Sequence, residues 1–199
     1  MHIMILGQTT SGKTTLAKHM AKSFRAQGLG VIVHDPVNDP EWECDSRETN
    51  FSAFISRYWA SRGCVAFFDE AGETASEHLQ EMTKTATRGR HWGHKNIYIA
   101  QRGALIPRTL RDQCSELFLF GSGLEDCKIH AAEWNAPVLR ENGPKLARGE
   151  FYHVARMGSI SRFSLEATLN NPKGKNDEST TNRRHGVNGA RISKKRARQ

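Results

Sequence analysis

The eight residues Gly7–Thr14 read Gly-Gln-Thr-Thr-Ser-Gly-Lys-Thr and match the pattern G-x-x-x-x-G-K-[ST] at every fixed position. The glycines let such a loop curl, so that successive backbone N–H groups point inward at phosphate oxygens. A helix that follows adds its positive N-terminal end. Lys13 would reach the β- and γ-phosphates, and the Thr14 hydroxyl would ligate Mg²⁺. The sequence therefore predicts a nucleoside triphosphate site, whose binding residues are Gly7, Gln8, Thr9, Thr10, Ser11, Gly12, Lys13, Thr14 and Thr15.

Two neighbouring acids, Asp69 and Glu70, follow the apolar run Val65–Phe68. If this run is a strand of a parallel sheet, the acids reach the carboxyl edge, where such folds bind ligands. We expect Asp69 to hold Mg²⁺ through a water, and Glu70 to be the general base for water attacking the γ-phosphate. Glu73 is a weaker candidate for the base, because an acid in the first turn of a helix needs no catalytic explanation.

Three further residues surround the next apolar run, Ile97–Ala100. Gln101 follows the run, where an amide can sense phosphate or position water, or simply end the strand in solvent. Arg88 and Arg90 precede it and so belong at the opposite edge, too far from their own nucleotide. They could stabilise transition-state charge in a neighbouring subunit of a head-to-tail ring, or only complement a helix dipole.

The chain alternates short apolar runs with longer amphipathic segments, which predicts an α/β fold with a mostly parallel central sheet flanked by helices. The expected strands are 3–6, 31–34, 65–68, 97–100, 117–120, 151–155 and 160–165. The expected helices are 13–27, 51–61, 74–88 and 124–134, with a helical turn near 107–112.

Charge divides the 199 residues into two regions. The net charge is +8, yet residues 170–199 hold nine Lys or Arg against two acids, and residues 1–169 are almost neutral. Few apolar residues follow Leu169, so we expect a 1–169 ATPase domain and a flexible, disordered basic tail at 170–199. The four cysteines form no C-x-x-C pair, and no apolar run could span a bilayer or serve as a signal peptide. These features predict a protein that is not secreted and stays in the cytosol.

The order of the motifs resembles the FtsK/HerA superfamily, and is most similar to the genome-packaging ATPases of tailless, membrane-containing double-stranded DNA viruses and phages. The likeness covers about Met1 to Arg156. Asp35-Pro36 and Gln101 are the features that best distinguish this superfamily from other proteins with the same glycine loop. Beside the glycine loop, the segments that carry it are Asp35-Pro36, Phe67–Ala71, Arg88–His91, Ile97–Arg102 and Ile106–Arg111.

This resemblance implies a RecA-like core, a homo-oligomeric ring of six subunits, and an ATP- and Mg²⁺-dependent motor that moves double-stranded DNA of any sequence. It implies packaging of a viral genome into a preformed capsid, with capsid or portal-vertex proteins as partners, in the host cytoplasm or the virion. It favours Arg90, and then Arg88, as the arginine that acts in trans. The basic tail could then contact DNA phosphates, or remain a solvated terminus.

Two other functions are compatible with the residues. Small-molecule kinases with this loop have a similar length, although they need an arginine-rich lid, for which Leu139–Arg148 is the one candidate. A DNA- or partner-binding protein could instead use the nucleotide as a switch, although a pure switch has little use for a base such as Glu70.

Overall fold

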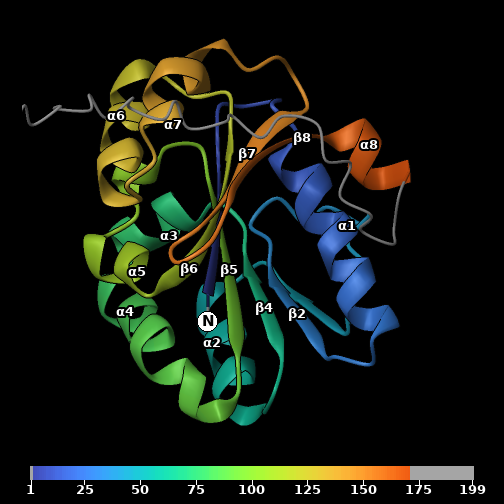
Figure 1. The fold of residues 1–199 in the computed structure, drawn as a ribbon. Coiled ribbons are helices and arrows are strands. Elements are labelled where there is room, and N and C mark those ends of the chain that lie inside the picture. Colours follow the sequence, from blue (N-terminus) through green and yellow to red (C-terminus); the bar gives the residue numbers. More distant parts are fainter. Residues whose placement is uncertain (1, 171–199) are drawn as a thin grey trace, which may run out of the picture.

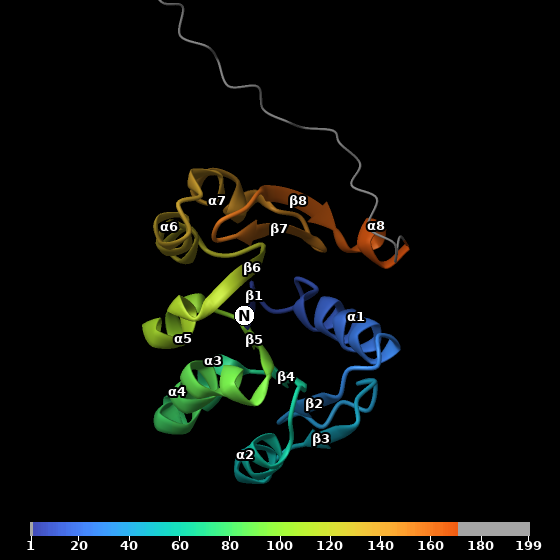
Figure 2. The ribbon, with the colours of Figure 1, turned by 60° about the horizontal axis from the view of Figure 1, so that its bottom comes forward.

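The computed structural model describes residues 2–170, which form one eight-stranded sheet with helices on both faces (Figures 1 and 2). The strands lie in the order β3-β2-β4-β5-β1-β6-β7-β8. All pairs from β3 to β6 are parallel, whereas β7 and β8 add an antiparallel hairpin at one edge. The strands are β1 (His2–Leu6), β2 (Val31–His34), β3 (Ser46–Glu48), β4 (Val65–Phe68), β5 (Lys95–Ala100), β6 (Cys114–Phe120), β7 (Glu150–Ala155) and β8 (Ile160–Ser164).

The helices divide unequally between the two faces, as the view along the sheet in Figure 2 shows. One face carries α1 (Lys13–Ala26) and the short α8 (Leu165–Asn170). The other carries α2 (Phe51–Ala60), α3 (Ala71–Glu77), α4 (Leu79–Arg88), α5 (Arg108–Asp112), α6 (Leu124–Glu133) and α7 (Pro137–Asn142). Short 3₁₀ helices lie at η1 (Gly89–Trp92), η2 (Gly103–Leu105) and η3 (Gly143–Lys145).

Each face of the sheet has its own apolar core. Along β1, Ile3 and Ile5 pack towards α1, whereas Met4 and Leu6 pack towards the larger group of helices. This alternation follows from the two-residue period of a strand. Because both faces are covered, β4 is apolar throughout, as the sequence pattern predicted, and its central neighbours are mostly apolar.

A buried polar network joins β5 to the helices beneath it. Asn96 is fully buried, donates through Nδ2 to Thr85 O (2.9 Å) and to the Tyr98 hydroxyl (2.9 Å), and accepts from the Tyr58 hydroxyl (3.1 Å). The Tyr58 hydroxyl also leaves no room for a β-carbon at Gly89, which would lie 1.9 Å from it. The network therefore fixes the turn between α4 and β5.

The α/β fold class predicted from the sequence is confirmed, with the following differences in the elements. The expected helix 74–88 is two helices, because His78 leaves the helical conformation at φ −127° and ψ 41°. The edge strand β3 was missed because its sequence, Ser-Arg-Glu, is polar. The short α7, which begins at Pro137, was also missed, and so was α8, which begins at Leu165 where the last strand was expected to end. Residues 171–199, which make up all but the first residue of the predicted basic tail, lie outside the described residues.

Within residues 2–170, no helix is long and apolar enough to cross a membrane.

Candidate nucleotide site at the carboxyl edge of the sheet

The glycine loop connects β1 to α1 in a conformation that requires its two glycines. Gly7 has φ 151° and Gly12 has φ 112°, values that other residues rarely adopt. A β-carbon on Gly7 would lie 2.6 Å from Phe120 Cβ, and one on Gly12 would lie 2.3 Å from Leu165 Cδ1. The strand β6 and the start of α8 therefore press directly against the loop.

The loop is also held by its backbone. Gln8 N donates to Gly121 O (2.9 Å), and Gly149 N donates to Ser11 O (3.0 Å). No side chain caps the start of α1, and no acid lies in its first turn. The first N–H groups of this 14-residue helix are thus free to bind an anion, and the helix dipole favours one.

Lys13 and Asp69 are both buried, with 8% exposure each. Lys13 Nζ donates to Gln8 O (2.9 Å). Burial lowers the pKa of Lys13, while the charges of Glu70 and Asp69 act in the opposite direction. The two acids predicted from the sequence are therefore close enough to Lys13 to interact with it electrostatically.

Burial also raises the pKa of Asp69 to about 6. The Glu70 N–H donates to Asp69 Oδ1 (3.0 Å) and opposes this shift, whereas the negative charges of Glu70 and Asp35 add to it. Glu70 itself occupies the left-handed region at φ 50° and precedes α3. The chain therefore turns sharply at Glu70, between β4 and α3.

These groups line a cleft of about 380 Å³. Thr14, Asp69 and Glu70 lie in its wall together with Thr15, Lys18, Asp35, Val37, Asp39 and Glu41. A hydroxyl and a carboxylate are suitable ligands for Mg²⁺, which usually takes its remaining ligands from phosphates and water. Residues 2–170 contain no group of three or more His, Cys, Asp or Glu side chains that could hold a metal by themselves.

Asp35 also lines this cleft, although the sequence analysis did not predict it as a site residue. It is fully buried, and it accepts hydrogen bonds from Val37 N (3.1 Å) and Asp39 N (2.5 Å). It lies beside Asp69 because β2 and β4 are adjacent parallel strands that end in register, and Asp69 N donates to His34 O. The signal in the sequence was an acid directly after each of two apolar runs.

Gln101 lies between the loop and the acids, because β5 separates β1 from β4. Its Oε1 accepts a hydrogen bond from the Thr9 hydroxyl (3.1 Å). A second pocket of about 290 Å³ opens beside it and is lined by Gln8, Gln101, Arg102, Gly123, Leu124, Glu125 and Asp126.

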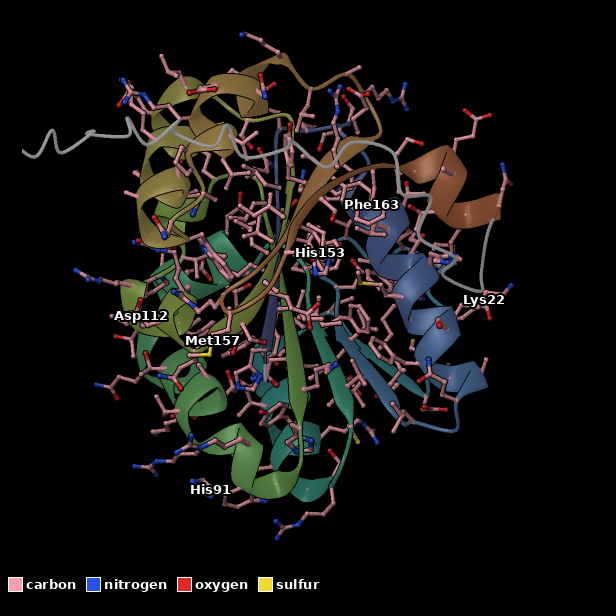
Figure 3. All side chains as sticks on the ribbon, in the orientation of Figure 1. Lys22, His91, Asp112, His153, Met157 and Phe163 are labelled. Carbon is pink, nitrogen blue, oxygen red and sulfur yellow. The ribbon has the colours of Figure 1, made fainter. Side chains whose placement is uncertain are left out.

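Arg88 and Arg90 lie at the opposite end of the molecule. Both side chains are exposed, at the end of α4 and in η1, which precede β5. The loop lies where β1 leads into α1, at the top of Figure 1, whereas Figure 3 places His91, the neighbour of Arg90, at the bottom. Within one chain, the structure does not bring these arginines to the glycine loop.

No known family model matches the sequence, and no curated protein matches it. Solved structures do match. The DNA-packaging ATPase B204 of Sulfolobus turreted icosahedral virus superimposes with a TM-score of 0.66 at 16% identity, over 82% of this chain and 96% of that one. The B204 genome-packaging NTPase of the second such virus, in complex with AMPPCP, gives a TM-score of 0.68 at 16% identity, over 81% and 95%.

A further match is VirB4 of Thermoanaerobacter pseudethanolicus, with a TM-score of 0.64 at 13% identity, over 82% of this chain and 88% of that one. The strand order, the glycine loop and these neighbours agree with the resemblance seen in the sequence. The chain has the same fold as these three proteins.

Proposed function

We propose that this protein hydrolyses ATP and uses the energy to move double-stranded DNA, packaging a viral genome into a preformed capsid. The observation that carries the proposal is the placement of Thr14, Asp69 and Glu70 around one cleft, with Lys13 of the glycine loop close enough to both acids to interact with them electrostatically. The two B204 neighbours, described as genome-packaging or DNA-packaging enzymes, support the finer assignment.

Each residue of the site has a role in hydrolysis. The loop amides and Lys13 would bind the phosphates, and Thr14 and Asp69 would hold Mg²⁺, which when bound would neutralise the charge of the phosphates. The Glu70 carboxylate accepts a proton from the attacking water, whose oxygen bonds to the γ-phosphorus as the bond to the ADP oxygen breaks. Gln101 orients the water or the γ-phosphate, because it lies between the loop and the acids.

The site is completed in trans. Arg90, with Arg88 as the second candidate, lies on an exposed turn that the Asn96 network fixes in place. In a ring of six subunits packed head to tail, this turn would meet the nucleotide cleft of the neighbouring subunit. The guanidinium group would stabilise the charge that develops on the transferring phosphate.

The basic segment 170–199 supplies a contact to DNA. Its nine cations can bind phosphates of any sequence, and such binding weakens as salt rises because counterions are released. Deleting residues 170–199 should weaken binding to duplex DNA and flatten the dependence of the binding constant on salt. An unchanged slope would show that the segment does not contact DNA.

Packaging also implies docking partners, which we place among the capsid or portal-vertex proteins, and a location in the host cytoplasm or the virion. The kinase and switch alternatives predict different chemistry. A kinase would transfer the phosphate to an acceptor, and a switch would bind ATP with little turnover.

One experiment separates the three functions. ATP hydrolysis is measured with purified protein and Mg²⁺, alone, with duplex DNA, and with candidate nucleosides. Stimulation by duplex DNA supports the motor. Turnover that requires a nucleoside would establish the kinase, and binding without turnover under every condition would establish the switch.

A further inference from the structure

The segment Arg102–Ile106, which follows Gln101 and includes η2, is attached to the two helices beside it. On one side it meets α3, which begins directly after Glu70. A β-carbon on Gly72 would lie only 2.9 Å from Leu105 Cβ, so the two backbones approach closely. Any displacement of the segment is therefore resisted by the helix that follows the proposed base.

On its other side the segment contacts α6. Arg102 Nε donates to Asp126 Oδ2 (3.2 Å), and a β-carbon on Gly103 would lie 1.9 Å from His130 Nε2. Asp126, His130 and Glu133 lie three or four residues apart, so they share one face of α6. That face is directed at the segment behind Gln101.

Arg111, on α5, holds the segment most firmly. Its Nη1 donates to Gly103 O (3.2 Å) and Ile106 O (2.6 Å), which are carbonyl groups at the start and end of the segment. Its Nε (3.2 Å) and Nη2 (2.7 Å) donate to Glu133 in a forked ion pair. The side chains of Arg111 and Glu133 are only 12% and 20% exposed.

A buried ion pair contributes little net stability, because both charges lose their hydration. Arg111 nevertheless uses two edges of its planar guanidinium group. One edge donates to the carboxylate of Glu133, and the other donates to two carbonyls of the same segment. A lysine could not reproduce this geometry, because its ammonium is a compact point charge. The arrangement is thus better suited to fixing the conformation of the segment than to stabilising the whole fold.

We propose that Arg111, held in place by Glu133, is a positioning residue for Gln101. The side chain of Gln101 is exposed and accepts a hydrogen bond from the Thr9 hydroxyl, so the position of its amide depends both on Thr9 and on the backbone that Arg111 fixes. Among residues 2–170, the side chain of Arg111 forms no hydrogen bond with the glycine loop, Asp69 or Glu70. It can therefore act on Gln101 only through the segment Arg102–Ile106. The inference rests on the proposed ATP hydrolysis, in which Gln101 orients the reacting groups.

Hydrogen exchange tests the positioning without any turnover. The N–H groups of Leu105 and Ile106 donate to Arg102 O and Gly103 O. In Arg111→Lys, exchange in a peptide spanning residues 101–107 should accelerate by about tenfold, because local opening becomes easier. The matched control is Arg108→Lys, which alters an exposed arginine of the same helix, 81% exposed, and should leave exchange unchanged.

Turnover supplies the second readout. Arg111→Lys should lower kcat by about tenfold and leave KM for ATP nearly unchanged, because the contact it supports is made mainly in the transition state. The same change should have no effect in a Gln101→Ala background, since a residue that acts through Gln101 cannot act once the amide is gone. An equal loss in both backgrounds would overturn the proposal.

The two readouts also separate this inference from the proposed function. Wild-type protein that hydrolyses no ATP contradicts the proposed function, whereas unchanged exchange at residues 101–107 contradicts the positioning role whatever the turnover. If Arg111→Lys does not fold, Glu133→Gln takes its place, because it keeps the shape of the side chain and removes the charge that holds Arg111. Faster exchange in that variant supports the role, and unchanged exchange overturns it.

Discussion

Two acids of the site are adjacent in sequence but differ in environment. Asp69 is buried and has a pKa raised to about 6, whereas Glu70 has a left-handed backbone conformation and is more exposed. Paired carboxylates in different surroundings are commonly divided between two roles. The geometry fits Asp69 as the residue that holds the cation and Glu70 as the one that accepts a proton.

Glu70→Gln tests this division of roles. The amide keeps the shape of the side chain but cannot accept the proton, so kcat should fall by about 10²- to 10⁴-fold. Binding of ATP, measured by calorimetry, should persist. Lys13→Ala is the companion variant and should lose productive binding itself. Turnover of Glu70→Gln close to that of the wild type would exclude Glu70 as the base.

His2 makes the stability of the fold depend on pH. Its Nδ1 accepts a hydrogen bond from Asn96 N (3.0 Å), and its Nε2 lies 3.0 Å from Ala86 O, which fits only a neutral ring with its proton on Nε2. Burial lowers its pKa to about 4, below the ordinary 6.5. Between these values the unfolded chain binds a proton that the folded chain does not, so stability falls as pH falls.

The free energy of unfolding, measured with urea, should therefore drop by about 1 to 2 kcal/mol between pH 6.5 and pH 5 through this residue. His2→Gln, which keeps a polar side chain but does not titrate, should have a smaller slope over the same range. Equal slopes for the two proteins would show that His2 does not contribute.

At the scale of elements, the decisive arrangement is the position of β5 between β1 and β4. It places Gln101 between the glycine loop and the two acids, and it lets the Thr9 hydroxyl reach an amide 92 positions away. The start of the same strand follows the turn that bears Arg90. One strand therefore connects the nucleotide cleft to the surface that we propose serves the neighbouring subunit.

Asn96, near the start of β5, should be essential for this connection. In Asn96→Leu, the hydroxyls of Tyr58 and Tyr98 and the carbonyl of Thr85 each lose a partner in a dry interior. The Tyr58 hydroxyl still donates to Thr85 O (3.3 Å), and the Tyr98 hydroxyl still lies 3.3 Å from Thr85 Oγ1, so each group loses one hydrogen bond and keeps another. A lost hydrogen bond costs about 0.5 to 1.5 kcal/mol, so we expect a total loss of about 2 to 4 kcal/mol. Urea unfolding measures it, and a loss below about 1 kcal/mol would contradict the role assigned to the network.

What the sequence revealed about the site depended on how local each signal is. The glycine loop and the acids after Val65–Phe68 are contiguous patterns whose meaning follows from a few neighbouring residues. The burial of Asp35 beside Asp69 depends on which strands are adjacent. The hydrogen bonds that Arg111 donates to the segment after Gln101 depend on where α5 and α6 pack. Such contacts are set by tertiary packing, and no periodicity in the chain encodes them.

The same reasoning applies to the elements. Strands buried on both faces were recognisable as apolar runs, because both surroundings select the same residues. The edge strand β3 has one neighbour and a polar sequence, and so it gave no such signal. The break at His78 was hidden because the residues on both sides favour helix.

At the scale of the whole molecule, the nucleotide cleft and the exposed turn with Arg90 lie at opposite ends. This separation makes the trans assignment testable by mixing. Arg90→Ala alone should bind ATP without turnover, and Lys13→Ala alone should not bind it productively. A mixture of the two should regain part of the activity, because an intact cleft can then meet an intact arginine. No recovery would contradict the ring, and Arg88→Ala mixed in the same way identifies which arginine serves.

The distance between cleft and arginine carries a consequence for assembly. Under the proposed trans assignment, a single subunit has a cleft without an arginine and an arginine without a cleft, so it cannot hydrolyse ATP by itself. An open row of any length always has one cleft without an arginine, and only closure into a circle removes that vacancy. Dilution would therefore abolish ATP hydrolysis by such an enzyme, although every subunit would still be folded.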